Sequence, residues 1–210
     1  NLVHPTLNKK IEINSERGRH ITVENNLRNN VVEFQPNDCA LSLDSDIGYI
    51  ISGPNMGGKS TYLRQNAIIV ILAHVGCFVP ASSATIGLVD KIFTRIGAAD
   101  DITNNSSTFM TEMTETSHGL NHATKRSLLI FDEIGRGTTN NEGIAVAYGI
   151  LKYMVTKLKS RFLFATHYAP ELNYLISIND KDNSDFCMND KISYYHTTLM
   201  SELLNKYLEK

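Results

Sequence analysis

The sequence Gly-Pro-Asn-Met-Gly-Gly-Lys-Ser at residues 53–60 decides the fold that we predict for this chain. It follows Ile47–Ser52, an apolar run with the length of a buried strand, and it leads into Lys59–Val75, where apolar residues recur close to helical spacing. The order of strand, G-x-x-x-x-G-K-S loop and helix is typical of a loop that binds the phosphates of a nucleotide. We therefore expect a nucleotide-binding domain.

Each kind of residue in this loop has a physical reason to be there. Glycine permits the dihedral angles that point backbone N–H groups at a phosphate, and the N-terminus of the following helix adds a partial positive charge. Lys59 would bring a full positive charge to the β- and γ-phosphates, and the Ser60 hydroxyl would bind Mg²⁺. We therefore expect ATP and Mg²⁺ as cofactors. The residues expected to bind the nucleotide are Gly53, Pro54, Asn55, Met56, Gly57, Gly58, Lys59, Ser60 and Thr61.

Further strands and helices are predicted to alternate along the chain. Apolar or alternating runs predict strands at Lys91–Ile96, Ser127–Phe131, Arg161–Ala165 and Ile192–Tyr195. Longer stretches predict helices at Ser107–Thr124 and Asn141–Lys159. This order favours an α/β fold with a mostly parallel sheet core flanked by helices, in which ligands bind beyond the carboxyl ends of the strands.

Three segments are expected along the chain. Residues 1–30 are polar and rich in Asn, so we predict an irregular entry segment that ends in a short strand, Val31–Phe34. The nucleotide-binding domain covers residues 31–198, with a loop at Asn179–Asp190, and residues 199–210 form a terminal helix of unknown role, Ser201–Lys210. The chain begins with Asn rather than Met and shows no signal-peptide pattern, so we expect a piece of a longer protein.

An acidic pair, Asp132 and Glu133, follows the predicted strand Ser127–Phe131. An Asp at the end of such a strand can hold Mg²⁺, often through water, and a neighbouring Glu can orient or deprotonate an attacking water molecule. Two solvated carboxylates at a strand end are the alternative, but the phosphate loop upstream favours the catalytic interpretation. We therefore predict Asp132 and Ser60 as metal ligands and Glu133 as catalytic.

Composition excludes some classes of protein. With 42% hydrophobic and 20% charged residues the chain is expected to be neither disordered nor a membrane span, and its most apolar stretch, Ala67–Ala73, is too short to cross a bilayer. A formal net charge of −2 lacks the basic excess of a domain that grips DNA by itself. The three cysteines lack metal-ligand spacing and indicate free thiols in a reducing compartment: Cys39, Cys77 and Cys187.

The loop at residues 53–60, together with the TYLRQ that follows it, resembles the phosphate loop of the MutS family of DNA mismatch-repair proteins. The family's Pro-Asn-Met insert is more specific than the general pattern. Further blocks match the family in order: GRH at 18–20, CFVPA at 77–81, DKIFTRIGAADD at 90–101, STFMTEM at 107–113, DEIGRGT at 132–138 and FATHY at 164–168. The resemblance covers most of the chain, and residues 64–80 are most similar to fungal mitochondrial MutS homologues.

This resemblance implies a P-loop NTPase built like ABC-type ATPases, in which each nucleotide lies between two subunits. It implies that Ser107 acts in trans, on the γ-phosphate in the partner subunit's site; a plain N-cap is the alternative, and the two roles can coexist. His167 matches the switch histidine that senses the γ-phosphate, and Glu133 would position the water. Phe34 and His196 are similar to the residues that pack on adenine, with a core phenylalanine and a surface histidine as the alternatives.

The loop Arg136–Thr138 matches the family's segment that crosses the subunit interface. Two departures from the family are conservative, because Ser52 replaces a common Thr and Glu142 stands where Asp is usual. The family's helix-turn-helix dimerisation element, mismatch-reading domain, connector, levers and clamp have no match here. Their absence bears against dimerisation and DNA binding by this chain alone.

The resemblance implies an ATPase that couples ATP binding and hydrolysis to the recognition of mismatched or damaged DNA, as an ATP-dependent DNA damage sensor. Its partners would be a second MutS-type subunit, in a homo- or heterodimer with composite ATP sites, and mismatched double-stranded DNA bound through other domains. No membrane partner is expected. The subfamily match predicts a mitochondrial location, with the nucleus as the alternative.

Three other interpretations stay open. A transporter-type or chromosome-maintenance ABC ATPase would carry Leu-Ser-Gly-Gly-Gln, but STFM occupies that place. A non-hydrolysing DNA-junction clamp of the MutS family would use ATP only as a conformational ligand, although Lys59, Asp132 and Glu133 are intact. The isolated chain could also be inert, with activity only in its parent protein.

Overall fold

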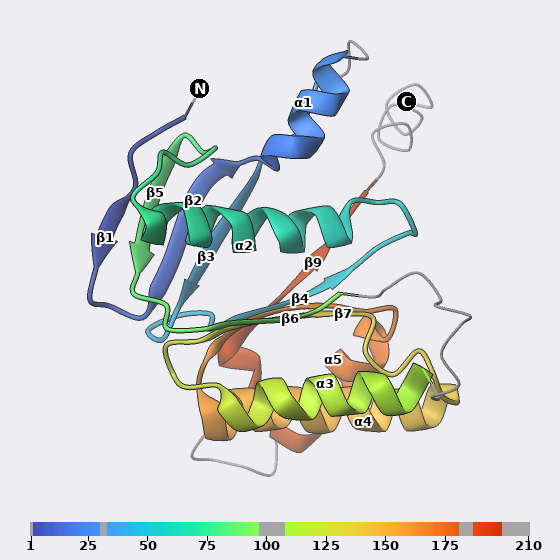
Figure 1. The fold of residues 1–210 in the computed structure, drawn as a ribbon. Coiled ribbons are helices and arrows are strands. Elements are labelled where there is room, and N and C mark those ends of the chain that lie inside the picture. The colour runs from blue at the N-terminus through green and yellow to red at the C-terminus, as the bar shows by residue number, and fades with distance from the viewer. Residues whose placement is uncertain (1, 30–32, 97–107, 181–186, 199–210) are drawn as a thin grey trace, which may run out of the picture.

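The computed structural model describes residues 2–29, 33–96, 108–180 and 187–198, which form two sheets (Figure 1). The larger sheet has five parallel strands in the order β6-β7-β8-β4-β9. Their bounds are β4 Gly48–Ser52, β6 Ile92–Arg95, β7 Leu128–Asp132, β8 Arg161–Ala165 and β9 Ile192–His196. The smaller sheet has the order β1-β5-β2-β3, with β2 antiparallel to both neighbours. Its strands are β1 Thr6–Asn8, β2 Glu12–Gly18, β3 Asn37–Ser42 and β5 Ser83–Gly87.

Helices cover both faces of the larger sheet. α2, Lys59–Val75, lies between the two sheets, where it contacts β2 of one and β7 and β8 of the other (Figure 1). The opposite face of the larger sheet carries three helices, α3 Thr108–His122, α4 Asn140–Tyr153 and α5 Ala169–Asp180. The short α1, Ile21–Asn29, extends from the smaller sheet.

The strand β7 shows why the central strands are mostly apolar. Leu128 and Ile130 pack into the core around α2, whereas Leu129 and Phe131 pack into the core on the opposite face. Successive side chains of a strand point to opposite faces, so a strand covered on both sides carries apolar residues on both faces. Because the strands are parallel, the carboxyl ends of β4, β7, β8 and β9 meet at one edge of the sheet, where the predicted site residues follow them.

Most predictions for the larger sheet are confirmed. The helix at Lys59–Val75 and the strand at Arg161–Ala165 have the predicted bounds, and the other predicted strands of this sheet match within one residue at each end. α2 ends at Gly76, whose φ of 84° lies in the left-handed region that glycine adopts without a clash. The α/β fold with a mostly parallel sheet flanked by helices is therefore correct.

The prediction of an irregular segment over residues 1–30 is wrong, since these residues contain β1, β2 and α1. The predicted strand Val31–Phe34 is also wrong where the structure describes it, because Glu33 and Phe34 have no regular structure and β3 begins at Asn37. The physical reason is that β2 buries only alternate residues, such as Ile13 and Ser15, so its sequence is polar overall. β5 and α5 were not predicted either.

The remaining predictions hold in part. The helix predicted at Asn141–Lys159 consists of α4 and a π-helical turn, Met154–Leu158, and ends at Lys159 with a φ of 51°. The predicted loop Asn179–Asp190 begins inside α5, and residues 181–186 lie outside the described part of the chain. Ser107 and the predicted helix at residues 199–210 also lie outside it. Of the described helices, none has the length and apolar character that a membrane span requires.

Candidate active site

The phosphate loop has the backbone geometry that its glycines allow. Gly53, Met56 and Gly58 have φ values of 140°, 65° and 88°, in the region that residues with side chains rarely adopt. A Cβ added to Gly53 would lie 2.1 Å from the Thr197 hydroxyl oxygen. Gly58 is the N-cap of α2 and provides no side-chain cap, so the first N–H groups of the helix face the loop without a capping side chain. This end of α2 is suited to an anion.

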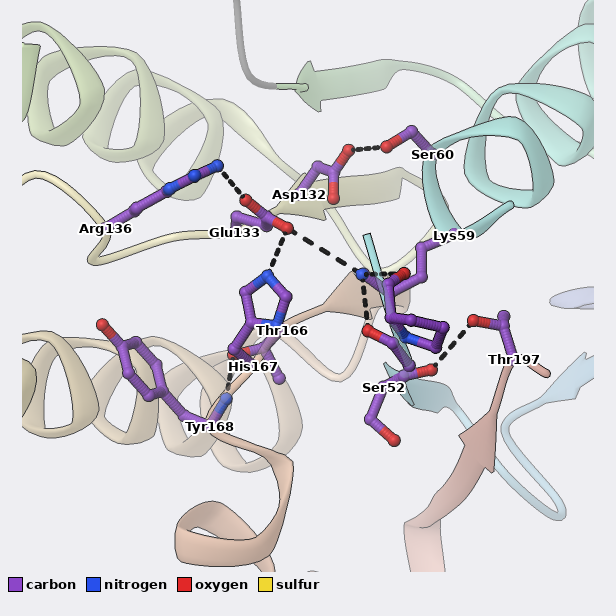
Figure 2. Close-up of polar contacts among 12 residues, drawn as sticks. Ser52, Lys59, Ser60, Asp132, Glu133, Arg136, Thr166, His167, Tyr168 and Thr197 are labelled. Carbon is purple, nitrogen blue, oxygen red and sulfur yellow. Dashed lines mark hydrogen bonds and ion pairs between the residues drawn. The ribbon is translucent and has the colours of Figure 1, made fainter. Parts of the chain in front are cut away.

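The Lys59 ammonium lies inside the loop. Its Nζ donates hydrogen bonds to the carbonyl oxygens of Gly53 at 2.8 Å and Pro54 at 3.1 Å (Figure 2). It lies 3.9 Å from an oxygen of the Glu133 carboxylate, and Lys59 is only 5% exposed. The fold therefore holds a buried cation within reach of both the phosphate loop and the acidic pair.

Glu133 is fixed on three sides. Its backbone N–H donates to the carbonyl oxygen of Ala165 at 2.9 Å, and its φ of 57° turns the chain sharply at the end of β7. One carboxylate oxygen lies 2.7 Å from His167 Nε2, and the other accepts a hydrogen bond from Arg136 at 2.6 Å (Figure 2). A carboxylate fixed in this way can orient a water molecule.

Asp132 faces α2 instead. The Ser60 hydroxyl donates to its Oδ2 atom, while Oδ1 is buried and has no hydrogen-bond partner among the described residues (Figure 2). Burial raises the pKa of Asp132, and the Ser60 hydroxyl and the Lys59 ammonium oppose this shift. A buried carboxylate oxygen beside a hydroxyl fits a hard divalent cation such as Mg²⁺, which would satisfy that oxygen.

Most of the predicted nucleotide-binding residues line one cavity of about 380 Å³. It is lined by Pro54, Asn55, Met56, Gly58, Lys59, Ser60, Thr61, Asp132, Glu133 and Arg136. Gly57 completes the loop through a hydrogen bond from its N–H to the Pro54 carbonyl at 3.1 Å. A second cavity, of about 420 Å³, lies at the end of β4 and contains Gly53, His167 and His196. The structure therefore gathers the loop, the acidic pair and His167 at one edge of the sheet.

The two residues predicted to pack on adenine lie apart. His196 lines the second cavity, and its Nδ1 lies 3.0 Å from the Ser52 hydroxyl. Phe34 is partly buried and lines a different cavity, of about 890 Å³, together with Arg17 and Arg19. The structure does not bring Phe34 and His196 into one cavity, and it does not describe Ser107.

The loop predicted to cross a subunit interface is exposed at its start and packed at its centre. The Arg136 side chain is 72% exposed, and it pairs with the Glu133 carboxylate. Gly137 packs on α3, because a Cβ there would lie 3.1 Å from the backbone of Phe109. The Thr138 hydroxyl donates to the carboxylate of Glu142, so this loop is also joined to the first turn of α4.

Sequence reasoning missed two residues that support the site. The Thr197 N–H donates to the Ser52 carbonyl at 2.8 Å and its side chain closes on Gly53, although no motif marks it. The Tyr168 N–H bonds the Thr166 hydroxyl at 3.0 Å, which fixes the turn that carries His167 (Figure 2). Tyr168 stands in the FATHY block, so a signal for it was present in the sequence.

The comparisons with known proteins agree with this geometry. A family model, MutS domain V, matches residues 49–206. The chain is 47% identical over 206 residues to a DNA mismatch repair protein MutS of Orientia tsutsugamushi, which covers 93% of this chain and 22% of the relative. It is 54% identical over 166 residues to the MutS of Rickettsia canadensis, covering 79% of this chain and 18% of the relative. It is 54% identical over 170 residues to the MutS of Lactobacillus gasseri, covering 80% and 19%.

These relatives are bacterial, and they give no support to the expected likeness to fungal mitochondrial homologues. The chain spans about a fifth of their length. The matched region includes the phosphate loop, the acidic pair and His167, which the fold gathers at one edge of the larger sheet. The chain therefore belongs to the MutS family, and it contains that family's domain V.

Proposed function

We propose that this chain binds ATP with Mg²⁺ and hydrolyses it, as a P-loop NTPase of the ABC type. The observation that carries the proposal is the placement of Glu133. Its carboxylate lies 3.9 Å from the Lys59 ammonium and is held by His167 and Arg136 on its two oxygens. This arrangement places Lys59, a cation that can bind phosphate, next to Glu133, a carboxylate that can orient or deprotonate water.

The residues divide the reaction between them. The loop N–H groups and the start of α2 bind the phosphates, and Lys59 can exchange its bonds to the Gly53 and Pro54 carbonyls for phosphoryl oxygens. Ser60 and Asp132 would hold Mg²⁺, which neutralises charge on the phosphates when it is bound. Glu133 accepts a hydrogen bond from the attacking water and orients it towards the γ-phosphate. His167, through its bond to Glu133, keeps that carboxylate in place.

The parent protein would use this reaction in DNA mismatch repair. The relatives are named DNA mismatch repair proteins, and the chain spans about a fifth of their length. We propose that ATP binding and hydrolysis are coupled to the recognition of mismatched or damaged DNA in other domains. The net charge of −2 supports this division, since the phosphate contacts of DNA would need basic residues elsewhere.

Further parts of the proposal rest on the family resemblance. Ser107 of a second MutS-type subunit would complete each ATP site from across a dimer interface, where the exposed Arg136 would also lie. His196, beside the phosphate loop, and Phe34 would contact the base. A mitochondrial location stays a prediction.

The test is ATP turnover by the purified chain over a wide range of protein concentration, with Glu133→Gln beside it. We expect specific activity that rises with concentration, because the site is composite, and that falls by about 100-fold or more in the variant. ATP binding should persist in Glu133→Gln, since the phosphate loop is intact. Equal turnover in the two proteins would remove Glu133 from the reaction.

The same experiment separates hydrolysis from the non-hydrolysing clamp. Binding of Mg·ATP without turnover at every concentration would support a clamp that uses ATP as a conformational ligand, or a site that other parts of the protein must complete. The full-length protein with mismatched DNA distinguishes the two explanations. It would hydrolyse ATP if the site only needed completion by other parts of the protein, and it would not if the protein were a clamp.

A further inference from the structure

Glu112 is a buried acidic residue that the proposed reaction does not use. It lies on α3 and is 6% exposed, and its carboxylate accepts a hydrogen bond from the backbone N–H of Gly135. Burying a carboxylate is unfavourable unless hydrogen bonds replace the lost water. The hydrogen bond from the Gly135 N–H is therefore the contact that compensates the burial of Glu112, and Gly135 lies two residues after Glu133.

The Gly135 peptide is held from two sides. Its N–H is bound by Glu112, and its carbonyl oxygen accepts a hydrogen bond from the Tyr168 hydroxyl at 3.3 Å. Tyr168 follows His167, which bonds the Glu133 carboxylate. Gly135 also has a φ of 87°, and a Cβ there would lie 2.7 Å from the Cα of Gly143, so the peptide has little room to shift.

A second contact joins the same loop to α3. A Cβ on Gly137 would lie 3.1 Å from the N and Cα atoms of Phe109, in the first turn of the helix. The loop from Glu133 to Gly137 thus rests on α3 through one hydrogen bond and one close backbone approach. At its start Glu133 itself has a φ of 57°, a conformation that persists only where the surroundings fix it.

We propose that Glu112 is a positioning residue that holds the Gly135 peptide and, through it, the Glu133 carboxylate in the place where it acts on water. The proposal rests on the proposed function, in which Glu133 orients that water. A hydrogen bond to a carboxylate is stronger than one between neutral groups, so losing the Glu112 carboxylate should free the loop from Glu133 to Gly137. A small displacement of a catalytic group lowers the rate of the chemical step more than it lowers substrate binding.

The test compares Glu112→Ala and Glu112→Gln with a matched control on the same helix. We expect kcat to fall by about tenfold or more in Glu112→Ala, with the Kd for Mg·ATP within about twofold of the parent chain. Glu112→Gln should recover most of kcat, because its amide oxygen can accept the same N–H. Glu115→Ala removes an exposed glutamate that pairs with Arg95 at 3.0 Å, and it should leave both constants unchanged.

Two results would overturn the proposal. In the first, Glu112→Ala keeps the kcat of the parent chain. In the second, kcat and ATP affinity fall together with the melting temperature and Glu112→Gln gives no recovery, which would make Glu112 a structural residue of α3 only.

Failure of the proposed function gives a different pattern, in which the parent chain and Glu133→Gln do not differ in turnover. Amide hydrogen exchange with Mg·ATP present then tests Glu112 directly. We expect exchange at Gly135 and Glu133 to be faster by about tenfold or more in Glu112→Ala than in Glu112→Gln and Glu115→Ala. Equal exchange in all three variants would show that Glu112 does not hold this loop.

Discussion

The end of the site that would receive the phosphates and the end that would receive the base are built differently. At the phosphate end Lys59, Glu133 and His167 lie within hydrogen-bond or ion-pair distance of one another or of the loop. At the base end Phe34 and His196 line separate cavities, of about 890 Å³ and 420 Å³. The structure thus brings the residues proposed to act on the phosphates together, but it leaves the two residues proposed to contact the base in separate cavities.

The difference follows from the elements that carry these residues. Lys59 opens α2, Glu133 directly follows β7, and His167 lies two residues after the end of β8, so a parallel sheet fixes all three at one edge. Phe34 lies between α1 and β3, in a stretch without regular structure. Preorganised charges lower the barrier of the chemical step, whereas base recognition adds binding energy that can form when the ligand arrives. The chemical end should therefore respond more strongly to substitution.

The largest effect is expected for Lys59→Ala. The variant loses a buried ammonium that would bind phosphoryl oxygens, and such charge-assisted bonds make large contributions, so the Kd for Mg·ATP should rise by about 100-fold or more. Titration with a fluorescent ATP analogue measures this. Lys125→Ala, which removes an exposed lysine, is the control and should bind like the parent chain. A rise of less than about fivefold in the Kd for Mg·ATP of Lys59→Ala would contradict the contrast between the two ends.

Gly53→Ala should come next. The added Cβ would lie 2.1 Å from the Thr197 hydroxyl, at a φ of 140°, so the loop must move. We expect ATP affinity to fall by about 30-fold, because strain of this kind costs about 1–3 kcal/mol. Gly149→Ala is the matched control, since nothing lies within 4 Å of a Cβ on that exposed helical glycine. It should leave ATP affinity unchanged and raise the free energy of unfolding by about 0.5–1 kcal/mol.

The two partners of Glu133 should differ in their effects. His167→Ala removes the 2.7 Å bond from the less exposed of the two partners, and we expect kcat to fall by about tenfold with little change in ATP affinity. Arg136→Ala should have a smaller effect on the isolated chain, because that side chain is 72% exposed and its ion pair is screened. A larger loss in Arg136→Ala than in His167→Ala would mean that the exposed arginine has a catalytic role of its own.

The sequence predicted the phosphate end well because its motifs are local. The strand, glycine loop and helix that carry Lys59 are contiguous, and β7 and β8 each contain four consecutive apolar residues, which marks them as buried strands. The smaller sheet escaped prediction because β2 buries only alternate residues and is polar on its other face. Thr197 could not be found either, because its contact with Gly53 joins positions far apart in the chain.

Substitutions of the two residues proposed to contact the base, His196 and Phe34, should have the smallest effects. They also test whether both residues contact the base although they line separate cavities. Stacking of a base on an aromatic side chain contributes about 1–3 kcal/mol, so a residue that contacts adenine should raise the Kd for Mg·ATP by about fivefold or more when it is replaced by Ala, without lowering kcat. His196→Ala is expected to reach this value, since His196 bonds Ser52 at the edge of the phosphate loop.

For Phe34→Ala the informative comparison is between ATP and inorganic triphosphate. A loss of affinity for ATP alone would show that Phe34 reaches the base once the nucleotide is bound. Affinities for ATP and triphosphate that both stay at the values of the unsubstituted chain in Phe34→Ala would mean that Phe34 does not contact the base, and that the base is held at the end of β9.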